Sequence, residues 1–217
     1  LKTPPLQQAF TMIDCYYRML AANPALTPFS ANFSPESGRI ATVLTVEGGE
    51  ACEGSLAMLR TLHRLGVCAL TLTWNENKEL AGGANEHRSR GITPLGHELI
   101  REMERIGVAL DLSHLSDAGI DDALGFCTRP VFASHSNARA LCKAPRCLKD
   151  EHIRAIAERG GVIGVNFYGP QLTDEGKGSI DDVVAADTRR ATPSPLPICG
   201  VGHPDHHRRS CREPRTT

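Results

Sequence analysis

Residues 92–116, ITPLGHELIREMERIGVALDLSHLS, contain a helix pattern, a glycine and an apolar run in direct succession. The apolar residues of the first part recur at helical spacing and are Leu95, Leu99, Met103 and Ile106. This spacing predicts a helix with one buried face. Gly107 is expected to end the helix, and residues 108–112 then form a strand. The stretch therefore predicts one helix–strand unit of an α/β fold.

The same alternation extends in both directions along the chain. Helices are predicted at residues 6–20, 55–64, 116–126 and 150–159, and strands at 40–46, 67–73, 130–133 and 162–167. The strands are continuous apolar runs, which is typical of parallel strands covered by helices. A doubly wound sheet and a (β/α)8 barrel both fit this pattern. No GxGxxG motif follows the first strand, so a dinucleotide-binding fold has no support.

Two details of this pattern are further expectations. Asp150 is predicted to cap the last helix, because it precedes the apolar periodicity. Residues 75–91 are polar and rich in glycine, and they are too many for a plain connection. We expect them to form a functional or covering loop.

Composition excludes several classes of protein. The chain has 217 residues, of which 41% are hydrophobic, enough for a core in one or two domains. Its 24 Lys and Arg against 25 Asp and Glu give a net charge of −1, which argues against a nucleic-acid-binding protein. There is no apolar run of about 18 residues, so no membrane segment is predicted. No signal peptide is visible, which slightly favours a cytoplasmic location, although the chain begins with Leu1 and is expected to be a fragment or a processed product.

The cysteines predict reduced thiols. All eight are scattered, and none forms a CxxC pair that would indicate a zinc ribbon. In a chain of this length, such scatter is more typical of free thiols than of a disulfide framework.

The last part of the chain differs in character from the rest. Residues 188–217 contain five Pro and six Arg, with no apolar periodicity. We therefore expect a partial barrel over residues 1–187 and a disordered tail over 188–217. The tail is either genuine or the product of a change in reading frame. Four of its residues resemble metal ligands but have no scaffold, and they are His203, Asp205, His206 and His207.

Candidate site residues follow from the strand ends, where barrel enzymes carry their catalytic groups. The polar or aromatic residues at the predicted strand ends are Glu47, Trp74, Asn75, Asp111, His114, His135, Asn166 and Tyr168. Among them, Glu47, His114 and His135 are a carboxylate and two imidazoles, a set that binds divalent metals. Neighbouring groups that can hydrogen-bond to such ligands are Asp111, Ser113, Ser134 and Ser136.

A structural interpretation of the same residues stays open. His114 or His135 alone is more typical of a hydrogen-bonded structural histidine than of a metal ligand. Glu47 precedes Gly48 and fits an ordinary turn carboxylate equally well. Their joint occurrence at successive strand ends supports the metal site and the structural alternative about equally.

Other charged residues are assigned to the surface. Four histidines on predicted helices or in the long loop are expected on solvated faces, and they are His63, His87, His97 and His152. Arg146 follows the fourth strand in an irregular stretch. A guanidinium there can clamp a substrate carboxylate, but the position alone favours an ordinary surface arginine.

Several long motifs, taken in order, resemble one known family. They are VEGGEA (46–51), LGVCALTLTWNENKELAGGA (65–84), the stretch 92–116 quoted above, RPVFASHSNARALCKAPR (129–146) and LKDEHIRAIAERGGVIGVNFYGPQL (148–172). Together they resemble the zinc-dependent membrane (renal) dipeptidase family, in a bacterial style, from about Leu6 to Val184. The resemblance implies a (β/α)8 barrel that hydrolyses dipeptides with a hydroxide held between two zinc ions.

The resemblance also implies roles for individual residues. Glu47 matches the family's EGG glutamate, which bridges the two zinc ions. His114 of DLSH and His135 of SHS match ligands of one of those ions. Arg146 matches the arginine that binds the terminal carboxylate of the substrate, and Tyr168 of NFY matches a tyrosine near the substrate pocket.

The departures from the family pattern concern both ends of the chain. Trp74 stands where the renal enzyme has a substrate-contacting histidine, as in many bacterial-looking relatives. No His-x-Asp pair for the second zinc precedes Leu6, and no SDFDG-like segment with the proton-transferring aspartate appears in the tail. The resemblance thus implies a barrel fragment that lacks the first and last strands, retains no assured catalytic residue and holds at most one zinc ion well.

The expected function is that of a metallodipeptidase, impaired by truncation, that acts on dipeptides and forms a homodimer as family members often do. One alternative is another metal-dependent barrel hydrolase that acts on lactones or cyclic amides. A lactonase needs no carboxylate clamp, so Arg146 discriminates between the two. The other alternative is an inactive gene fragment.

Overall fold

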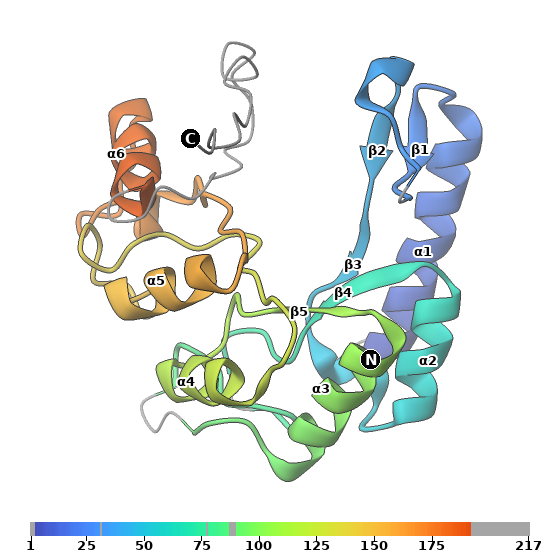
Figure 1. The fold of residues 1–217 in the computed structure, drawn as a ribbon, viewed down its shortest axis with the longest axis horizontal. Helices are drawn as coiled ribbons and strands as arrows, with labels where there is room; N and C mark the ends of the chain where they lie inside the picture. Colours follow the sequence, from blue (N-terminus) through green and yellow to red (C-terminus); the bar gives the residue numbers. More distant parts are fainter. Residues whose placement is uncertain (1–2, 31, 77, 87–89, 192–217) are drawn as a thin grey trace, which may run out of the picture.

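Strands and helices alternate along the chain and build a parallel sheet (Figure 1). The computed structural model describes residues 3–30, 32–76, 78–86 and 90–191. The central sheet has the order β3–β4–β5, formed by β3 (Leu44–Val46), β4 (Val67–Thr71) and β5 (Ala109–Asp111), all parallel. The connecting helices are α2 (Leu56–Arg64) and α3 (Pro94–Ile106). Because the strands are neighbours in chain order, their arrangement matches that of a β/α barrel.

The next two predicted strands continue the series through single bridges. Phe132 bridges Asp111 in parallel, and Ile163 bridges Ala133 in parallel. The helices that connect these segments are α4 (Asp117–Phe126) and α5 (Asp150–Glu158). Five parallel segments therefore follow one another in space, and the predicted α/β fold with parallel strands is confirmed.

The N-terminal part differs from the prediction. The long helix α1 (Pro5–Ala22) is as expected, but the single buried strand predicted over residues 40–46 is wrong. The segment divides at Val43 into β2 (Ile40–Thr42) and β3. Strand β2 pairs in parallel with a strand that was not predicted, β1 (Leu26–Pro28). Ile40 is 63% exposed and Val43 is 54% exposed, so the apolar run is buried only in part.

A tertiary contact of Arg39 explains the division. The Arg39 guanidinium donates from Nη2 to the Leu26 carbonyl oxygen (2.7 Å) and from Nε to the Pro24 carbonyl oxygen (3.2 Å). These bonds hold the first half of the run beside β1, while Leu44 begins the pairing with β4. β-branched composition predicts extended backbone, but it does not identify the neighbouring strand.

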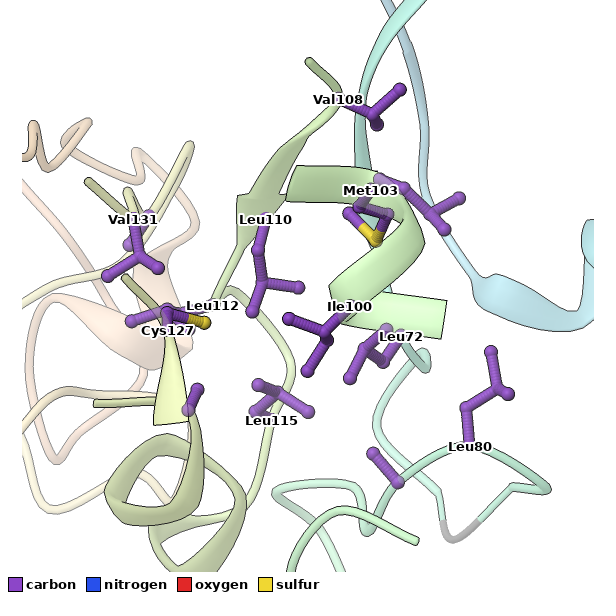
Figure 2. Close-up of a cluster of buried hydrophobic side chains, with 14 of the residues drawn as sticks. Leu72, Leu80, Ile100, Met103, Val108, Leu110, Leu112, Leu115, Cys127 and Val131 are labelled. Carbon is purple, nitrogen blue, oxygen red and sulfur yellow. The ribbon is translucent and has the colours of Figure 1, made fainter. Parts of the chain in front are cut away.

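Helix α3 packs against the sheet through buried apolar side chains. Figure 2 shows Ile100 and Met103 of α3 close to Leu110 of β5 and Leu72 beyond β4. All four side chains are buried. Complete burial of a side chain of this size stabilises the fold by about 1.5–3 kcal/mol. The apolar face that predicted α3 therefore also attaches this helix to the sheet.

Capping chemistry explains both ends of α3 but not the start of α5. The Thr93 hydroxyl accepts a hydrogen bond from the Gly96 amide at the start of α3 (3.1 Å), and Gly107 ends this helix at a φ of 85°. At α5 the prediction that Asp150 is the N-cap is wrong. Lys149 occupies that position without a side-chain cap, and Asp150 lies in the first turn, where the helix dipole favours a carboxylate.

The Thr93 cap gives a first prediction. Thr93→Ala removes the cap of α3 and is expected to lower the free energy of unfolding by about 0.5–2 kcal/mol, measured by urea titration. Thr11→Ala is the matched control, because the exposed Thr11 hydroxyl bonds back to the Gln7 carbonyl within α1 and caps no helix end. We expect that control to stay within about 0.5 kcal/mol of the wild type. Equal effects of the two changes would contradict a capping role for Thr93.

His152 is a second correction. This side chain is only 1% exposed, and Nε2 lies 3.0 Å from Asp121 Oδ1 on α4, so its assignment to a solvated face is wrong. The period of α5 explains the error, because His152 shares the buried face with Ile153 and Ile156. His63 and His97 are partly buried, and His87 lies outside the described residues.

Three expectations concern the remaining chain. The six cysteines in the described part are free. None of the helices built from the described residues has the length and apolar character needed to span a bilayer. Helix α6 (Ile180–Ala191) crosses the boundary expected at residue 188. Residues 192–217 and their four ligand-like side chains lie outside the described residues, so the disordered tail stays a prediction.

Candidate metal centre

Glu47 is positioned at the carboxyl end of β3. The next residue, Gly48, has a φ of 104°, which favours glycine, and its amide donates to Thr71 Oγ1 at the end of β4 (2.6 Å). Gly49 passes so close to the backbone that a Cβ there would lie 2.7 Å from the Leu72 carbonyl oxygen. The two glycines therefore turn the chain tightly and leave the Glu47 side chain at the edge of the sheet.

The two histidines are positioned by one buried carboxylate. Asp111 Oδ1, at the end of β5, accepts hydrogen bonds from the amides of Ser113 (2.9 Å) and Ser134 (3.0 Å). These amides belong to the two segments that carry His114 and His135. The His135 amide also donates to Ser113 Oγ (3.3 Å). Asp111 thus joins two loops that are distant in sequence.

The structure brings Glu47, His114 and His135 together. His114 Nε2 lies 2.7 Å from Glu47 Oε1 and 2.9 Å from His135 Nε2. His135 Nε2 lies 3.3 Å from the same carboxylate oxygen. One ligand atom from each residue falls within 4.8 Å of the others. The convergence expected from the strand ends is therefore present.

Burial and charge favour the ligand forms of these groups. Hydrogen bonds from His114 and then His135 hold the pKa of Glu47 well below its usual range. Burial lowers the pKa of His114, which outweighs the opposite effect of its hydrogen bond to Glu47. Near neutral pH the site therefore contains an ionised carboxylate and a neutral imidazole, the states in which these groups bind metals.

The donor set fits a divalent metal. Ligand atoms around a tetrahedral zinc ion lie roughly 3.4 Å apart, since the bonds are about 2.0–2.2 Å long. The three separations here, 2.7, 2.9 and 3.3 Å, are shorter, so the side chains would have to move apart by up to about 0.7 Å to surround such an ion. The outer nitrogens are also held, because Asn75 Oδ1 is 2.7 Å from His114 Nδ1 and Ser134 Oγ is 2.7 Å from His135 Nδ1. Such outer hydrogen bonds are typical of metal-binding histidines.

A cavity of about 430 Å³ adjoins the metal centre. Its walls include His114 and all three predicted substrate-binding residues, Trp74, Arg146 and Tyr168. The Trp74 ring lies 5.8 Å from the His114 ring, centroid to centroid. Trp74 and Tyr168 are about half exposed, so two aromatic faces border the cavity. Its size and lining suit a small organic molecule.

Arg146 is a buried residue of this cavity. It is only 5% exposed, so the interpretation as an ordinary surface arginine is wrong. Its guanidinium donates from Nη2 to the His135 carbonyl oxygen (3.3 Å) and from Nη1 to Ser136 Oγ (3.5 Å). Nε is buried and has no hydrogen-bond partner among the described residues. Burial lowers the pKa of Arg146, while the nearby Asp111 and Glu47 carboxylates oppose that effect.

One structural residue of the site escaped the sequence analysis. Asn137 is fully buried, and its Nδ2 donates to the carbonyl oxygens of Asn166 and Gln171 (2.8 Å each). Asn166 donates its amide to Asn137 Oδ1 (3.0 Å), and its own Oδ1 accepts from the Tyr168 amide (2.9 Å). Asn137 thereby holds the loop that carries Tyr168. Its only signal in the sequence is its position directly after the SHS motif.

Solved structures with a similar fold include metal-dependent hydrolases. An amidohydrolase from Pseudomonas aeruginosa superposes with a TM-score of 0.78 at 25% identity, over 85% of this chain and 58% of that protein. A metallopeptidase from Rhodobacter sphaeroides, solved with a phosphinate mimic of the dipeptide L-Ala-D-Ala, gives a TM-score of 0.73 at 26% identity. That match covers 82% of this chain and 55% of the metallopeptidase. The barrel-type arrangement is thus shared with proteins of this class.

Sequence comparison points in the same direction. A dipeptidase of Schizosaccharomyces pombe, itself uncharacterized, is 37% identical over 181 residues, which are 81% of this chain and 40% of that protein. Dipeptidase 3 of mouse is 34% identical over 73% of this chain and 34% of its own length. The chain thus spans about two fifths or less of these relatives. A sequence model described as membrane dipeptidase (peptidase family M19) matches residues 2–186. This chain belongs to the membrane dipeptidase family.

Proposed function

We propose that this chain contains the zinc-binding and substrate-binding part of a metallodipeptidase. The observation that carries the proposal is the convergence of Glu47, His114 and His135 beside a cavity lined by the buried Arg146. A binding site for a small peptide with a free carboxylate needs this combination of a metal centre and a nearby fixed cation.

The metal ligands in this proposal are Glu47, His114 and His135. One carboxylate oxygen and two imidazole nitrogens suit zinc better than magnesium or calcium, which prefer oxygen ligands. When bound, zinc polarises an amide carbonyl and lowers the pKa of water, which is the chemistry that peptide hydrolysis requires. Asp111 keeps the two histidine loops in register through the Ser113 and Ser134 amides.

Arg146 supplies the recognition of the substrate carboxylate. A guanidinium pairs with a carboxylate through two parallel hydrogen bonds, and burial strengthens each of them. Its bonds to His135 and Ser136 fix the guanidinium beside the metal centre. The Trp74 and Tyr168 rings border the same cavity and exclude water from the bound peptide.

The placement of Arg146 also weighs against the alternative substrates. Lactones and cyclic amides carry no carboxylate that would need a buried cation. A buried guanidinium with an unpartnered Nε is costly unless a ligand or another group makes use of its charge. The position of Arg146 in the cavity therefore favours dipeptides.

The proposal predicts a specific loss of binding in Arg146→Met. We expect the zinc-loaded variant to bind a phosphinate mimic of Ala-Ala roughly 10- to 150-fold more weakly, because hydrogen bonds to a charged group contribute about 1.5–3 kcal/mol. Isothermal titration calorimetry measures the affinities. The same mimic with a C-terminal carboxamide should bind the variant and the wild type equally.

Arg154→Met serves as the control, because Arg154 is exposed on α5 and does not line the cavity. It should bind the carboxylate ligand as the wild type does. Equal weakening of the carboxylate and carboxamide ligands by Arg146→Met would contradict a carboxylate clamp. Hydrolysis of a lactone that is unaffected by Arg146→Met would instead support the alternative hydrolase.

A further inference from the structure

Asn75 contacts the ring nitrogen of His114 that faces away from the metal centre. Its Oδ1 lies 2.7 Å from His114 Nδ1, while His114 Nε2 faces Glu47 and His135. The two ring nitrogens of His114 therefore have different neighbours: an amide side chain on one side and the metal-binding set on the other. His114 itself is only 5% exposed, so its ring is largely shielded from bulk water.

The chemistry of a neutral imidazole links these two sides. In a neutral imidazole one ring nitrogen carries a proton and the other has a lone pair. A hydrogen-bond acceptor beside one nitrogen favours the tautomer with the proton on that nitrogen. A metal bound through Nε2 requires the proton on Nδ1. The amide oxygen of Asn75 accepts from Nδ1–H, so it favours the tautomer that leaves Nε2 free to bind the metal over the Nε2–H form that donates to Glu47 in the absence of metal.

The backbone holds both residues in this arrangement. Asn75 has a φ of 59° and His114 a φ of 74°, two of the three positive values among non-glycine residues in the described ranges. Asparagine adopts this conformation more readily than most residues. The Asn75 carbonyl accepts from the Asn85 amide (2.9 Å), and the His114 carbonyl accepts from the Ala84 amide (2.9 Å). One loop thus fixes both strained residues.

The packing of this loop leaves little freedom. A Cβ at Gly83 would lie 2.2 Å from the Asn75 carbonyl carbon, so the loop backbone touches Asn75 directly. Gly83 also bridges Leu115, the residue after His114. Asn75 and His114 are therefore held against the same short segment, which keeps the contact between their side chains fixed.

We propose that Asn75 is a positioning residue that fixes the tautomer and orientation of His114 for zinc. This inference rests on the proposed zinc site and adds a residue to it. Asn75 acts through His114 and need not touch the metal. The hydrogen bond, and not the backbone conformation alone, carries the effect.

Two variants separate the side chain from the backbone. Asn75→Gly removes the acceptor but favours the positive φ, so a purely conformational role predicts unchanged or better zinc binding. Our proposal predicts a 10- to 100-fold weaker affinity for zinc, the range found for such outer hydrogen bonds. Asn75→Asp keeps an acceptor at the same atom and is expected to retain the affinity within about threefold or to tighten it.

Competition with a chromophoric zinc chelator measures these affinities without any turnover. Long-range ¹H–¹⁵N spectra of the zinc-loaded chain give an independent signature, because they distinguish Nδ1–H from Nε2–H histidines. The wild type and Asn75→Asp should show a slowly exchanging Nδ1–H at His114, and in Asn75→Gly that proton should exchange faster. Glu53→Gly is the control, since Glu53 is exposed and is the third residue with a positive φ.

The outcomes distinguish this inference from the proposed site. A wild-type chain that binds no zinc refutes the zinc site and, with it, the role of Asn75. A wild type that binds zinc, together with an Asn75→Gly variant of equal affinity and an unchanged Nδ1–H signal, refutes the role of Asn75 alone. Loss of affinity in Asn75→Asp equal to that in Asn75→Gly also overturns it, because the acceptor is then irrelevant.

Discussion

Replacing His114 with glutamine is expected to weaken zinc binding by roughly 100- to 1,000-fold. Four-ligand zinc sites gain about 10–16 kcal/mol on binding, so one imidazole accounts for about 2.5–4 kcal/mol. His114 is the buried member of the set and contacts both other ligands. Removing it leaves Glu47 and His135, too few ligands to hold the ion against water. Chelator competition at neutral pH measures the loss.

The matched control is His97→Gln. His97 is a partly buried histidine on α3 that packs against Phe126, with ring centroids 4.5 Å apart. It shares no contact with the metal centre in the described residues, so its replacement should leave zinc affinity unchanged. The thermal midpoints of the metal-free variants check that both remain folded. Equal zinc affinities for His114→Gln and the wild type would exclude His114 as a ligand.

The sequence predicted the fold best where burial has a clear period. Helix α3 and strand β5 are such a case, because one apolar face and one apolar run leave few alternatives. The prediction failed where contacts between distant parts of the chain determine the structure. Arg39 divides the run at 40–46 between two sheets, and α4 covers His152. Neither contact has a local signature, since the partners lie 13 and 31 residues away.

The candidate site shows the same division. Glu47 and His114 are 67 residues apart, yet both could be selected because parallel strands end at one edge of the sheet. This rule for strand ends selects residues that directly follow strands, but it does not predict the contacts between separate loops. The bonds of Asn75 to His114 and of Asn137 to Asn166 join separate loops and needed the structure. The burial of Arg146 is likewise a property of the assembled cavity.

Gly164 provides the link between the stability of the sheet and the metal centre. Its amide donates to the Ala133 carbonyl (2.8 Å), and its carbonyl accepts from the Ser136 amide (2.9 Å), on either side of His135. A Cβ at position 164 would lie 1.9 Å from the Ser134 carbonyl oxygen. That oxygen belongs to the backbone, so the overlap is relieved only if the two segments separate. The position of the segment around His135 therefore depends on Gly164, which lies 29 residues later in the chain and has no side chain.

Gly164→Ala is accordingly expected to lower the free energy of unfolding by about 3 kcal/mol or more, at the upper end of the range for overpacking. Zinc affinity should fall with it, because His135 moves with Ser134. Urea titration and chelator competition on the same sample measure the two losses. The identical change at Gly125 has the opposite sign, because no heavy atom lies within 4 Å of a Cβ there and alanine favours the α4 helix by up to about 1 kcal/mol. If Gly164→Ala were as stable as the wild type, the segments around 134 and 164 could not lie as close as they do here. The support of His135 would then have to come from Asp111 and Ser113 alone.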